Sequence, residues 1–493
     1  MGCWSAPLQG RLPVIADLKP YAHYKESGLA WLGTVPGHWD ISRSKRLFAA
    51  GQELARPDDV QLSATQAFGV IAQSDYEQRT GYRVVKISMH LDRRRHVEAD
   101  DFVISMRIFQ GGLERAWASG AIRSSYVVLK PSTHVNANYF RYLFKSAPYI
   151  AALRVTADFI RDGQDLNYSN FCGVDLPLIP LAEQAAIGRF LGWANGQLER
   201  TIRAKRKVIA LLNEQKQAIV NRAFVRGLDS SVALRPSGTP WLGDIPTHWE
   251  AMRLKHCVSP IEQGWSPQCE RQPAGEDEWG VLKVGCVNKD SFNAQQNKKL
   301  PGSVRPDPSL EIKHGDILMS RANTSNLLGL AALAEKPRDK LILCDKLFRF
   351  RPRSDRFHSK FMVLALRAKP SRAQIEMSTN GASSSMQNIG QGVVKNLWVA
   401  MPPAREQAEI VSHLERVTHP LNVAVNRMER EIELLREYRT RLIADVVTGQ
   451  LDVREAALHL PDDIAADADA TVDDLDSDDE TDDAETTEET TEA

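Results

Sequence analysis

The chain has 493 residues, of which 43% are hydrophobic and 25% are charged. This is the composition of a globular protein, and the length predicts two to four domains. The longest apolar run, Leu327 to Ala334, is far too short to cross a membrane as a helix. Six scattered cysteines without a Cys-x-x-Cys pair argue against a zinc site and against a disulfide framework, and they fit a reducing cytoplasm.

The net charge of −1 conceals two regions of opposite sign. Residues 461–493 hold sixteen Asp or Glu and no Lys or Arg, which is the composition of a disordered, solvated tail. The rest of the chain has 62 basic residues against 63 − 16 = 47 acidic ones, an excess of +15. Such a basic body suits a polyanionic partner, although a mildly basic globular protein is the simpler reading.

The first element in chain order is a motif that occurs twice. Residues 27–39 read Ser-Gly-Leu-Ala-Trp-Leu-Gly-Thr-Val-Pro-Gly-His-Trp, and residues 237–249 repeat eight of these thirteen positions. We call both copies the His-Trp motif. A shared set of two Trp, a Pro and a His in register indicates an internal duplication. We expect its tryptophans to pack within each half, with partner anchoring as the alternative; they are Trp31, Trp39, Trp241 and Trp249.

The first variable block, residues 40–178, follows that motif and reads as mixed α/β. Arg107 and Gln110 lie beside a Gly-Gly pair, which favours a loop that approaches DNA, because Arg can bind guanine and Gln can bind adenine through two hydrogen bonds. Arg93 and Arg94 belong to a basic run that could bind phosphates, with a solvated face as the alternative.

A long helix is predicted next, and it too occurs twice. Pro-x-x-Glu-Gln-Ala opens each copy, and apolar residues at steps of three and four follow it. Its acidic residue falls in the first helical turn, and the residues that we assign to packing or docking are Glu183, Gln184, Glu406 and Gln407. Two successive steps of four, next to Asn195-Gly196 and His419-Pro420, predict a short helix, a break, and then a long helix over about 197–226 and 420–448.

The second variable block, residues 250–401, shares little sequence with the first but is also predicted to be mixed α/β. Its polar segment from Arg321 suggests base contacts, with turn chemistry as the alternative; the residues are Arg321, Asn323, Thr324 and Ser325. Gln164 and Gln387 coincide at the 223-residue offset of the helix repeat. We predict DNA contact for both, with local hydrogen bonding as the alternative.

The order of motif, block and helix, all present twice, resembles a symmetric dimer fused into one chain. Two apolar helix stripes most simply pack against each other as an antiparallel pair. A helix of about thirty residues is roughly 45 Å long, comparable to one turn of B-DNA, so that such a pair could space two recognition lobes over two half-sites. Because the lobes differ in sequence, the half-sites should differ as well.

The predicted fold class is therefore α+β, with two mixed α/β recognition domains separated by two long antiparallel coiled-coil helices in a pseudo-two-fold repeat. The expected boundaries are 1–39 for an N-terminal segment with its motif, 40–178, 179–236 for the first helical region, 237–249 for the second motif, 250–401, 402–456 for the second helical region, and 457–493 for the acidic tail.

These doubled motifs resemble the specificity subunit of type I restriction-modification systems, over about residues 21–455. Within the blocks, Asp101 to Gly112 resembles the "DFVIS-R-FQGG" segment of that family's target recognition domains, and Gly315 to Arg321 resembles its looser Gly-Asp-Ile-Leu form. The tail lies outside the family pattern.

The resemblance implies a subunit that reads an asymmetric bipartite DNA site and docks other chains. It implies two methyltransferase subunits and two translocase-endonuclease subunits as partners. It also implies that those partners use S-adenosylmethionine, ATP and magnesium, while this chain binds no cofactor or metal and has no catalytic residues.

Two other classes of function remain as alternatives. A self-contained methyltransferase or nuclease is disfavoured, because Met401-Pro-Pro-Ala lacks the amide and aromatic ring that hold a flipped base and Pro306-Asp307…Glu311-Ile-Lys313 is too compact for a shared metal. No Gly-x-x-x-x-Gly-Lys-Ser/Thr loop is present for ATP. A scaffold that does not bind DNA is disfavoured by the basic body.

Overall fold

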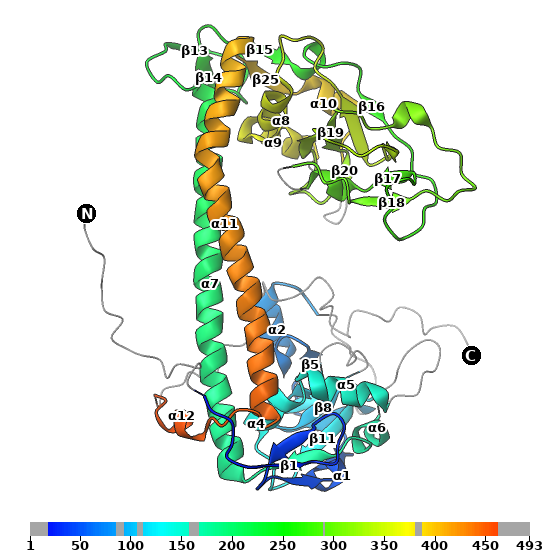
Figure 1. Cartoon of the computed structure of the whole chain (residues 1–493), viewed down its shortest axis with the longest axis vertical. Helices are drawn as coiled ribbons and strands as arrows, with labels where there is room; N and C mark the ends of the chain where they lie inside the picture. The colour runs from blue at the N-terminus through cyan, green and yellow to red at the C-terminus, as the bar shows by residue number, and fades with distance from the viewer. Residues whose placement is uncertain are drawn as a thin grey trace. The chain divides into compact units, whose positions relative to one another are not determined.

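The computed structural model describes residues 18–84, 93–105, 112–156, 167–288, 291–379 and 387–461. They form two compact units: unit 1 takes Met1–Lys205 and Glu429–Ala493, and unit 2 takes Arg206–Met428. Figure 1 shows that each unit combines a small mixed α/β domain with part of two long helices, α7 (Leu181–Arg226) and α11 (Ala404–Val447). The predicted α+β protein with an internal repeat is confirmed. Within the described ranges, no helix is long and apolar enough to cross a membrane.

The two domains are built on four-stranded sheets with the same order of strands. Unit 1 has β4 (Phe48–Gly51), β11 (Val127–Pro131), β8 (Phe102–Ile104) and β9 (Glu114–Arg115), all antiparallel. Unit 2 has β16 (Glu262–Gln263), β23 (Leu347–Phe350), β19 (Ile317–Ser320) and β21 (Ala331–Leu333), also antiparallel. The variable blocks therefore share a fold that their sequences do not reveal.

Two short strand pairs also repeat. Each His-Trp motif supplies the second strand of a pair whose first strand lies just before the motif: β1 (Tyr24–Glu26) pairs with β2 (Thr34–Pro36), and β13 (Leu234–Pro236) pairs with β14 (Asp244–Pro246) in the same register. Each block begins and ends on one antiparallel pair: β3 (Asp40–Ser42) with β12 (Leu176–Leu178), and β15 (Glu250–Arg253) with β25 (Trp398–Met401). The chain therefore enters and leaves each variable block at neighbouring points.

The remaining elements decorate these sheets. Unit 1 adds α1 (Ser44–Leu47), β5 (Leu62–Thr65), β6 (Gly69–Ala72), α2 (Gln73–Thr80), β7 (Arg95–Val97), β10 (Gly120–Ile122), α4 (Ala137–Leu143), α5 (Ala147–Val155), α6 (Tyr168–Cys172) and α12 (Arg454–Leu458). Unit 2 adds β17 (Gly280–Leu282), β18 (Asn297–Lys299), β20 (Ala322–Asn323), β22 (Leu341–Ile342), α8 (Ser359–Arg367), α9 (Lys369–Met377), β24 (Gln387–Asn388), α10 (Gln391–Asn396) and the short 3₁₀ helices η3 (Leu254–His256), η4 (Val284–Val287) and η5 (Pro308–Leu310).

An aspartate starts the central strand of each sheet. The carboxylate of Asp101 accepts a hydrogen bond from the backbone N–H of Glu98, at 3.0 Å, and that of Asp316 accepts one from Lys313, at 2.8 Å. The preceding residue has a positive φ in both units, +74° at Asp100 and +88° at Gly315. Glycine takes this left-handed conformation without strain, whereas aspartate tolerates it. Burial raises the pKa of Asp101 to about 6.

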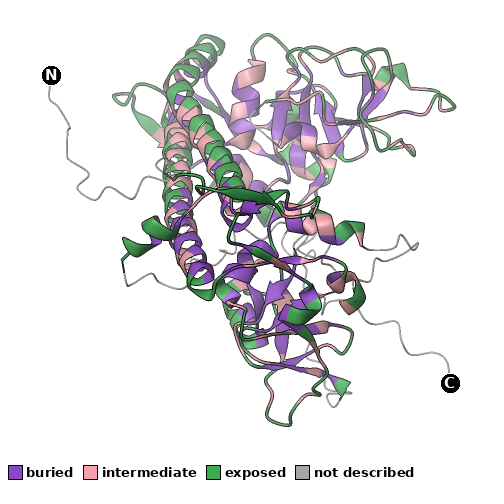
Figure 2. Cartoon of the chain, turned by 60° about the horizontal axis from the view of Figure 1, so that its bottom comes forward, coloured by how far each residue is buried: buried purple, intermediate pink, exposed green. Residues whose placement is uncertain are grey.

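The core of each unit lies between its sheet, its domain helices and the long helices, as the buried residues in Figure 2 show. In unit 1 the Phe48 ring contacts Phe102 and Phe140 with centroids 5.8 and 5.1 Å apart. Leu442 and Val446 of α11 belong to the same cluster. Unit 1 therefore needs residues from both ends of the chain to complete its core.

The long helices run antiparallel within unit 1. Lys205 of α7 forms an ion pair with Glu431 of α11 at 2.5 Å, and Glu199, further back on α7, pairs with Arg439, further on along α11. In unit 2, Val220, Ala223 and Phe224 of α7 share a cluster with Ile410, Val411 and Leu414 of α11. Side chains of the apolar stripes predicted on the two long helices therefore contribute to the cores of both units.

The predicted break in each helix is wrong. The helix α7 passes through Asn195-Gly196, and α11 contains Pro420 in its interior. Leu198 and Ile202 are both buried, so the two steps of four move the apolar stripe around the helix rather than end it. A proline in a helix interior costs about 3 kcal/mol, and the burial of apolar residues such as Leu414 in the same helix offsets it.

Candidate functional site

The two repeated sequence motifs bind each other in both units. The Glu183 carboxylate accepts a hydrogen bond from Trp39 Nε1 at 3.0 Å and lies 2.7 Å from His38 Nε2. Tyr21 donates a third hydrogen bond to it, at 2.7 Å, and burial together with this bond raises the pKa of the tyrosine hydroxyl. The same arrangement recurs in unit 2 between Glu406, Trp249 Nε1 at 3.1 Å and His248 Nε2 at 2.7 Å.

The glutamine after each glutamate fixes the start of a domain helix. Gln184 accepts a hydrogen bond from the backbone N–H of Asn136, the N-cap of α4, at 2.7 Å. Gln407 accepts one from His358, the N-cap of α8, at 2.8 Å. Their amide groups donate to backbone carbonyls just before the domain helix and just before the long helix, namely those of His134, Ile179, Arg356 and Pro402. Both glutamines are buried, so these side chains hold each unit together.

The repeated tryptophans differ in burial. Trp39 and Trp249 are fully buried, whereas Trp31 and Trp241 are half-buried. The Trp31 ring packs edge-on against Tyr149 with the centroids 5.8 Å apart. This placement gives Trp39 and Trp249 no surface for a partner protein.

In unit 2 the structure brings together the polar residues singled out in the second block. Strands β20 and β24 pair antiparallel, which puts Asn323 directly opposite Gln387 although 64 residues, 387 − 323, separate them in sequence. Asn323 is partly exposed and donates to the Asn288 side chain at 3.1 Å. Thr324 and Ser325 follow it on the surface. The pair of amide side chains is held by backbone pairing and is open to solvent.

Arg321 extends this surface toward a second group of residues. Its guanidinium donates to the backbone carbonyl of Asp345 at 3.4 Å, a long contact that leaves most of its donors available. Gln263 also donates to that carbonyl, at 3.2 Å, and the neighbouring Trp265 is 38% exposed. The surface that we call the β20–β24 surface comprises Gln263, Trp265, Asn288, Arg321, Asn323, Thr324, Ser325 and Gln387.

Sequence reasoning missed three of these residues: Gln263, Trp265 and Asn288. Gly264 was the available signal, because a Cβ atom there would lie 2.0 Å from the carbonyl oxygen of Leu343. The glycine lets the Gln-Gly-Trp segment lie against the strand end, which presents its neighbours to solvent.

The candidates in the first block divide into two groups. Arg107, Gln110 and Gln164 lie outside the described residues. Arg93 is exposed, whereas Arg94 is only 5% exposed, so the burial of its side chain conflicts with the predicted phosphate contact. Next to it, His96 is buried between Asp59 and Glu98, at 2.8 and 2.9 Å. The basic run is therefore partly internal, since Arg94 and His96 are buried whereas Arg93 is exposed.

Among the described residues, no group of three His, Cys, Asp or Glu is placed to hold a metal ion. The repeated histidines are used in the contacts with Glu183 and Glu406. The β20–β24 surface can present hydrogen-bonding side chains to a large polar ligand.

The chain is similar to several curated proteins. It is 36% identical over 173 residues to the specificity subunit of the type I restriction enzyme EcoEI from Escherichia coli, a match that covers 35% of this chain and 29% of that subunit. It is 22% identical over 327 residues to the StySPI specificity subunit from Salmonella potsdam, covering 66% of this chain and 67% of that one. No family model matches the chain.

A solved structure from work on complex assembly and conformational transition of the type I restriction-modification system is similar in fold. It aligns with a TM-score of 0.57 at 15% identity and covers 84% of this chain and 98% of that chain.

Proposed function

We infer that the chain belongs to the specificity-subunit family of type I restriction enzymes and that it selects the DNA sequence on which such a complex acts. The observation that carries this proposal is the duplicated unit, in which a common scaffold presents a different variable block in each half. Two scaffolds of one design with different surfaces would read two different half-sites, which together make an asymmetric bipartite target.

The β20–β24 surface is suited to reading base edges. Asn and Gln side chains bind adenine through two hydrogen bonds, and Arg binds guanine in the same way. Asn323 and Gln387 project from paired strands and Arg321 precedes them, so their backbone positions are fixed before DNA arrives. Trp265 adds an apolar group that can contact the methyl group of thymine.

In unit 1 the exposed Arg93 stays a proposed phosphate contact. Arg107, Gln110 and Gln164 also remain predicted DNA contacts. We withdraw Arg94 because its side chain is buried.

We propose that catalysis resides in partner subunits: two methyltransferase subunits and two translocase-endonuclease subunits, which use S-adenosylmethionine, ATP and magnesium. This chain would bind none of these cofactors and would work with its partners in the cytoplasm. Trp39 and Trp249 are occupied internally, so that docking has to use other residues.

We assign the docking of the methyltransferase subunits to a surface around an exposed leucine that occurs in both halves of the chain. Leu211 of α7 and Leu434 of α11 are equivalent at the 223-residue offset and are 55% and 47% exposed. Val208 and Tyr438, one helical turn from them, are exposed as well. An apolar patch present once per half suits a partner that binds twice.

The variant Leu211→Glu with Leu434→Glu is expected to keep its fold, because both side chains are on the surface, and to lose the partner subunits. Truncation of a central interface residue typically costs about 2 kcal/mol or more, equivalent to at least about thirtyfold in affinity. Native mass spectrometry of the chain mixed with its cognate methyltransferase would measure this loss. Val423→Glu, an exposed apolar residue without a repeated counterpart, is the control and should assemble normally. Normal assembly of the double variant would contradict the assignment.

DNA reading is tested by Asn323→Ala in the assembled methyltransferase complex. A lost two-bond contact to a base should cost about 1–3 kcal/mol in one half-site and leave the other unchanged. The measurement is methylation of duplexes with single substitutions in either half. Ser309→Ala, on a 3₁₀ helix away from β20 and β24, serves as the control. Equal losses at both halves would indicate a folding or assembly defect and contradict the proposed base contact.

A further inference from the structure

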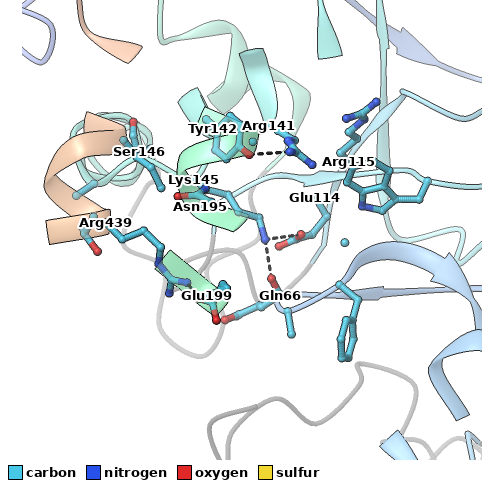
Figure 3. A pocket seen from close by; sticks show the side chains of 18 residues that line it. Gln66, Glu114, Arg115, Arg141, Tyr142, Lys145, Ser146, Asn195, Glu199 and Arg439 are labelled. Carbon is cyan, nitrogen blue, oxygen red and sulfur yellow. Dashed lines mark hydrogen bonds and ion pairs between the residues drawn. The ribbon is translucent and has the colours of Figure 1, made fainter. Parts of the chain in front are cut away.

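A cleft of about 410 Å³ lies within unit 1 between the variable domain and the long helices. Figure 3 shows its walls: Arg115 and Glu114 of β9, Arg141 of α4 and Lys145 just after it, Glu199 of α7 and Arg439 of α11. The proposed function uses none of these residues. Besides its candidate DNA-contacting residues, unit 1 thus has a cleft that could bind a ligand.

The accessible charge in this cleft is positive. Four basic residues and two acidic residues line it, 4 − 2 = +2. Each acidic residue is buried beneath a more exposed cation: Lys145 is 35% exposed over Glu114 at 3%, and Arg439 is 32% exposed over Glu199 at 5%. Arg141 contributes a third cation, and its guanidinium packs on the Trp117 ring and donates to the Tyr142 hydroxyl at 2.6 Å. An approaching ligand therefore meets cations first.

The equivalent cleft of unit 2 shows that the fold does not require this charge. That cleft, of about 480 Å³, is lined by Glu335, Lys336, Lys360 and Glu415, 2 − 2 = 0. The 223-residue offset equates Glu415 with Gly192, and the shared sheet equates Glu335 with Trp117; Gly192 and Trp117 both line the cleft of unit 1. Lys360 lies 2.9 Å from both glutamates, which raise its pKa and balance its charge. Only unit 1 thus has a net positive cleft at this place.

The described chain ends next to the positive cleft. Arg189 of α7 donates to the backbone carbonyls of Leu460 and Pro461, at 2.9 and 3.1 Å. Gly192, one helical turn further on, lines the cleft. The 493 − 461 = 32 residues that follow Pro461 carry sixteen Asp or Glu and no Lys or Arg. An extended chain advances about 3.3 Å per residue, so that about five residues are enough to pass around a helix about 10 Å wide.

We propose that the acidic segment 462–493 binds in cis to the positive cleft of unit 1, where its carboxylates meet Arg141, Lys145 and Arg439. The covalent connection keeps the segment at an effective concentration in the millimolar range, so weak exposed ion pairs are sufficient to hold it. The contact is sensitive to salt, because exposed charges are screened within about 10 Å at 0.1 M. Any other polyanion that uses this cleft has to displace the segment first.

The test uses the intact chain and a carbodiimide, which joins a carboxylate to an amine that it contacts. We expect mass spectrometry to find Lys145 linked to Asp or Glu of residues 462–493 at low salt, in monomers and independent of protein concentration. High salt, or Arg141→Gln, should lower the yield about threefold or more. Lys336, in the neutral cleft of unit 2, is the matched control and should not link to the segment.

Three outcomes would overturn the proposal. The segment could link to Lys336 as often as to Lys145, which would show non-specific attraction. The links could join different molecules, as isotope-mixed samples would reveal, which would exclude binding in cis. Finally, the Lys145 link could be absent while Arg141→Gln weakens binding of a DNA duplex, which would assign the cleft to DNA phosphates. Thermal unfolding of Arg141→Gln confirms that a lower yield does not come from a damaged fold.

Discussion

Replacing Glu183 by Ala is expected to lower the free energy of unfolding of unit 1 by about 3–5 kcal/mol, because it breaks a buried, charged hydrogen-bond group. The carboxylate accepts hydrogen bonds from Trp39 and Tyr21 and pairs with His38. Each buried donor left without an acceptor costs about 1–3 kcal/mol. The residue also ties the His-Trp motif to α7, so the loss affects the assembly of the whole unit.

Unit 2 provides the matched comparison. The Glu406 side chain is 23% exposed against 4% for Glu183, and no tyrosine in the described part of the chain donates to it. Glu406→Ala should therefore cost less, about 1–2 kcal/mol, since water can replace part of what is lost. Urea unfolding followed by tryptophan fluorescence measures the loss of stability in both variants. Glu409→Ala, an exposed glutamate on α11, should change stability by less than about 0.5 kcal/mol. Equal effects of all three changes would contradict the structural role of the motif.

Much of the architecture could be predicted from the sequence because the chain repeats itself. The two His-Trp motifs and the two Pro-x-x-Glu-Gln starts indicated the duplication, and the apolar steps indicated the long helices. That the glutamate of one motif binds the tryptophan and histidine of the other could not be predicted, since 144 residues separate Trp39 from Glu183. Local spacing carries no information about such a contact.

The same limit applies to the candidate DNA surface. Asn323 and Gln387 were each predicted from local composition, but their pairing across β20 and β24 depends on the tertiary fold. The helix break was predicted from Asn-Gly and His-Pro. The burial of Leu198 and Ile202 overrides the first local preference in α7, and the burial of residues such as Leu414 offsets the second in α11. The burial of Arg94 likewise depends on the tertiary fold, which a short basic run does not reveal.

A fragment of residues 1–234 is expected to form a dimer. In the whole chain, α11 covers the core of unit 1 with Leu442, Val446 and Val447, all buried. At the 223-residue offset their counterparts on α7 are Ile219, Ala223 and Phe224, which the fragment retains. A second copy can therefore supply the missing helix, and each apolar residue covered contributes about 1.5–3 kcal/mol. The two copies would pair about a two-fold axis.

With methyltransferase subunits, this dimer should modify a site made of the first half-sequence and its inverted repeat. Light scattering gives the mass of the fragment, and sequencing of modified bases gives its motif. Phe224→Asp is the control, because a charge at the position that the second copy would bury should keep the fragment monomeric. A wild-type fragment that is folded and monomeric would contradict the pairing.

In the proposed function, the two variable blocks separately determine the two halves of one DNA target. The most direct measurement exchanges residues 250–401 for the corresponding block of the EcoEI specificity subunit and reads the methylated sequence of the assembled complex from sequencing of modified bases. We predict a bipartite sequence that keeps one half and replaces the other. A methylated sequence unchanged in both halves, from an assembled and active complex, would show that the second block does not determine either half of the target.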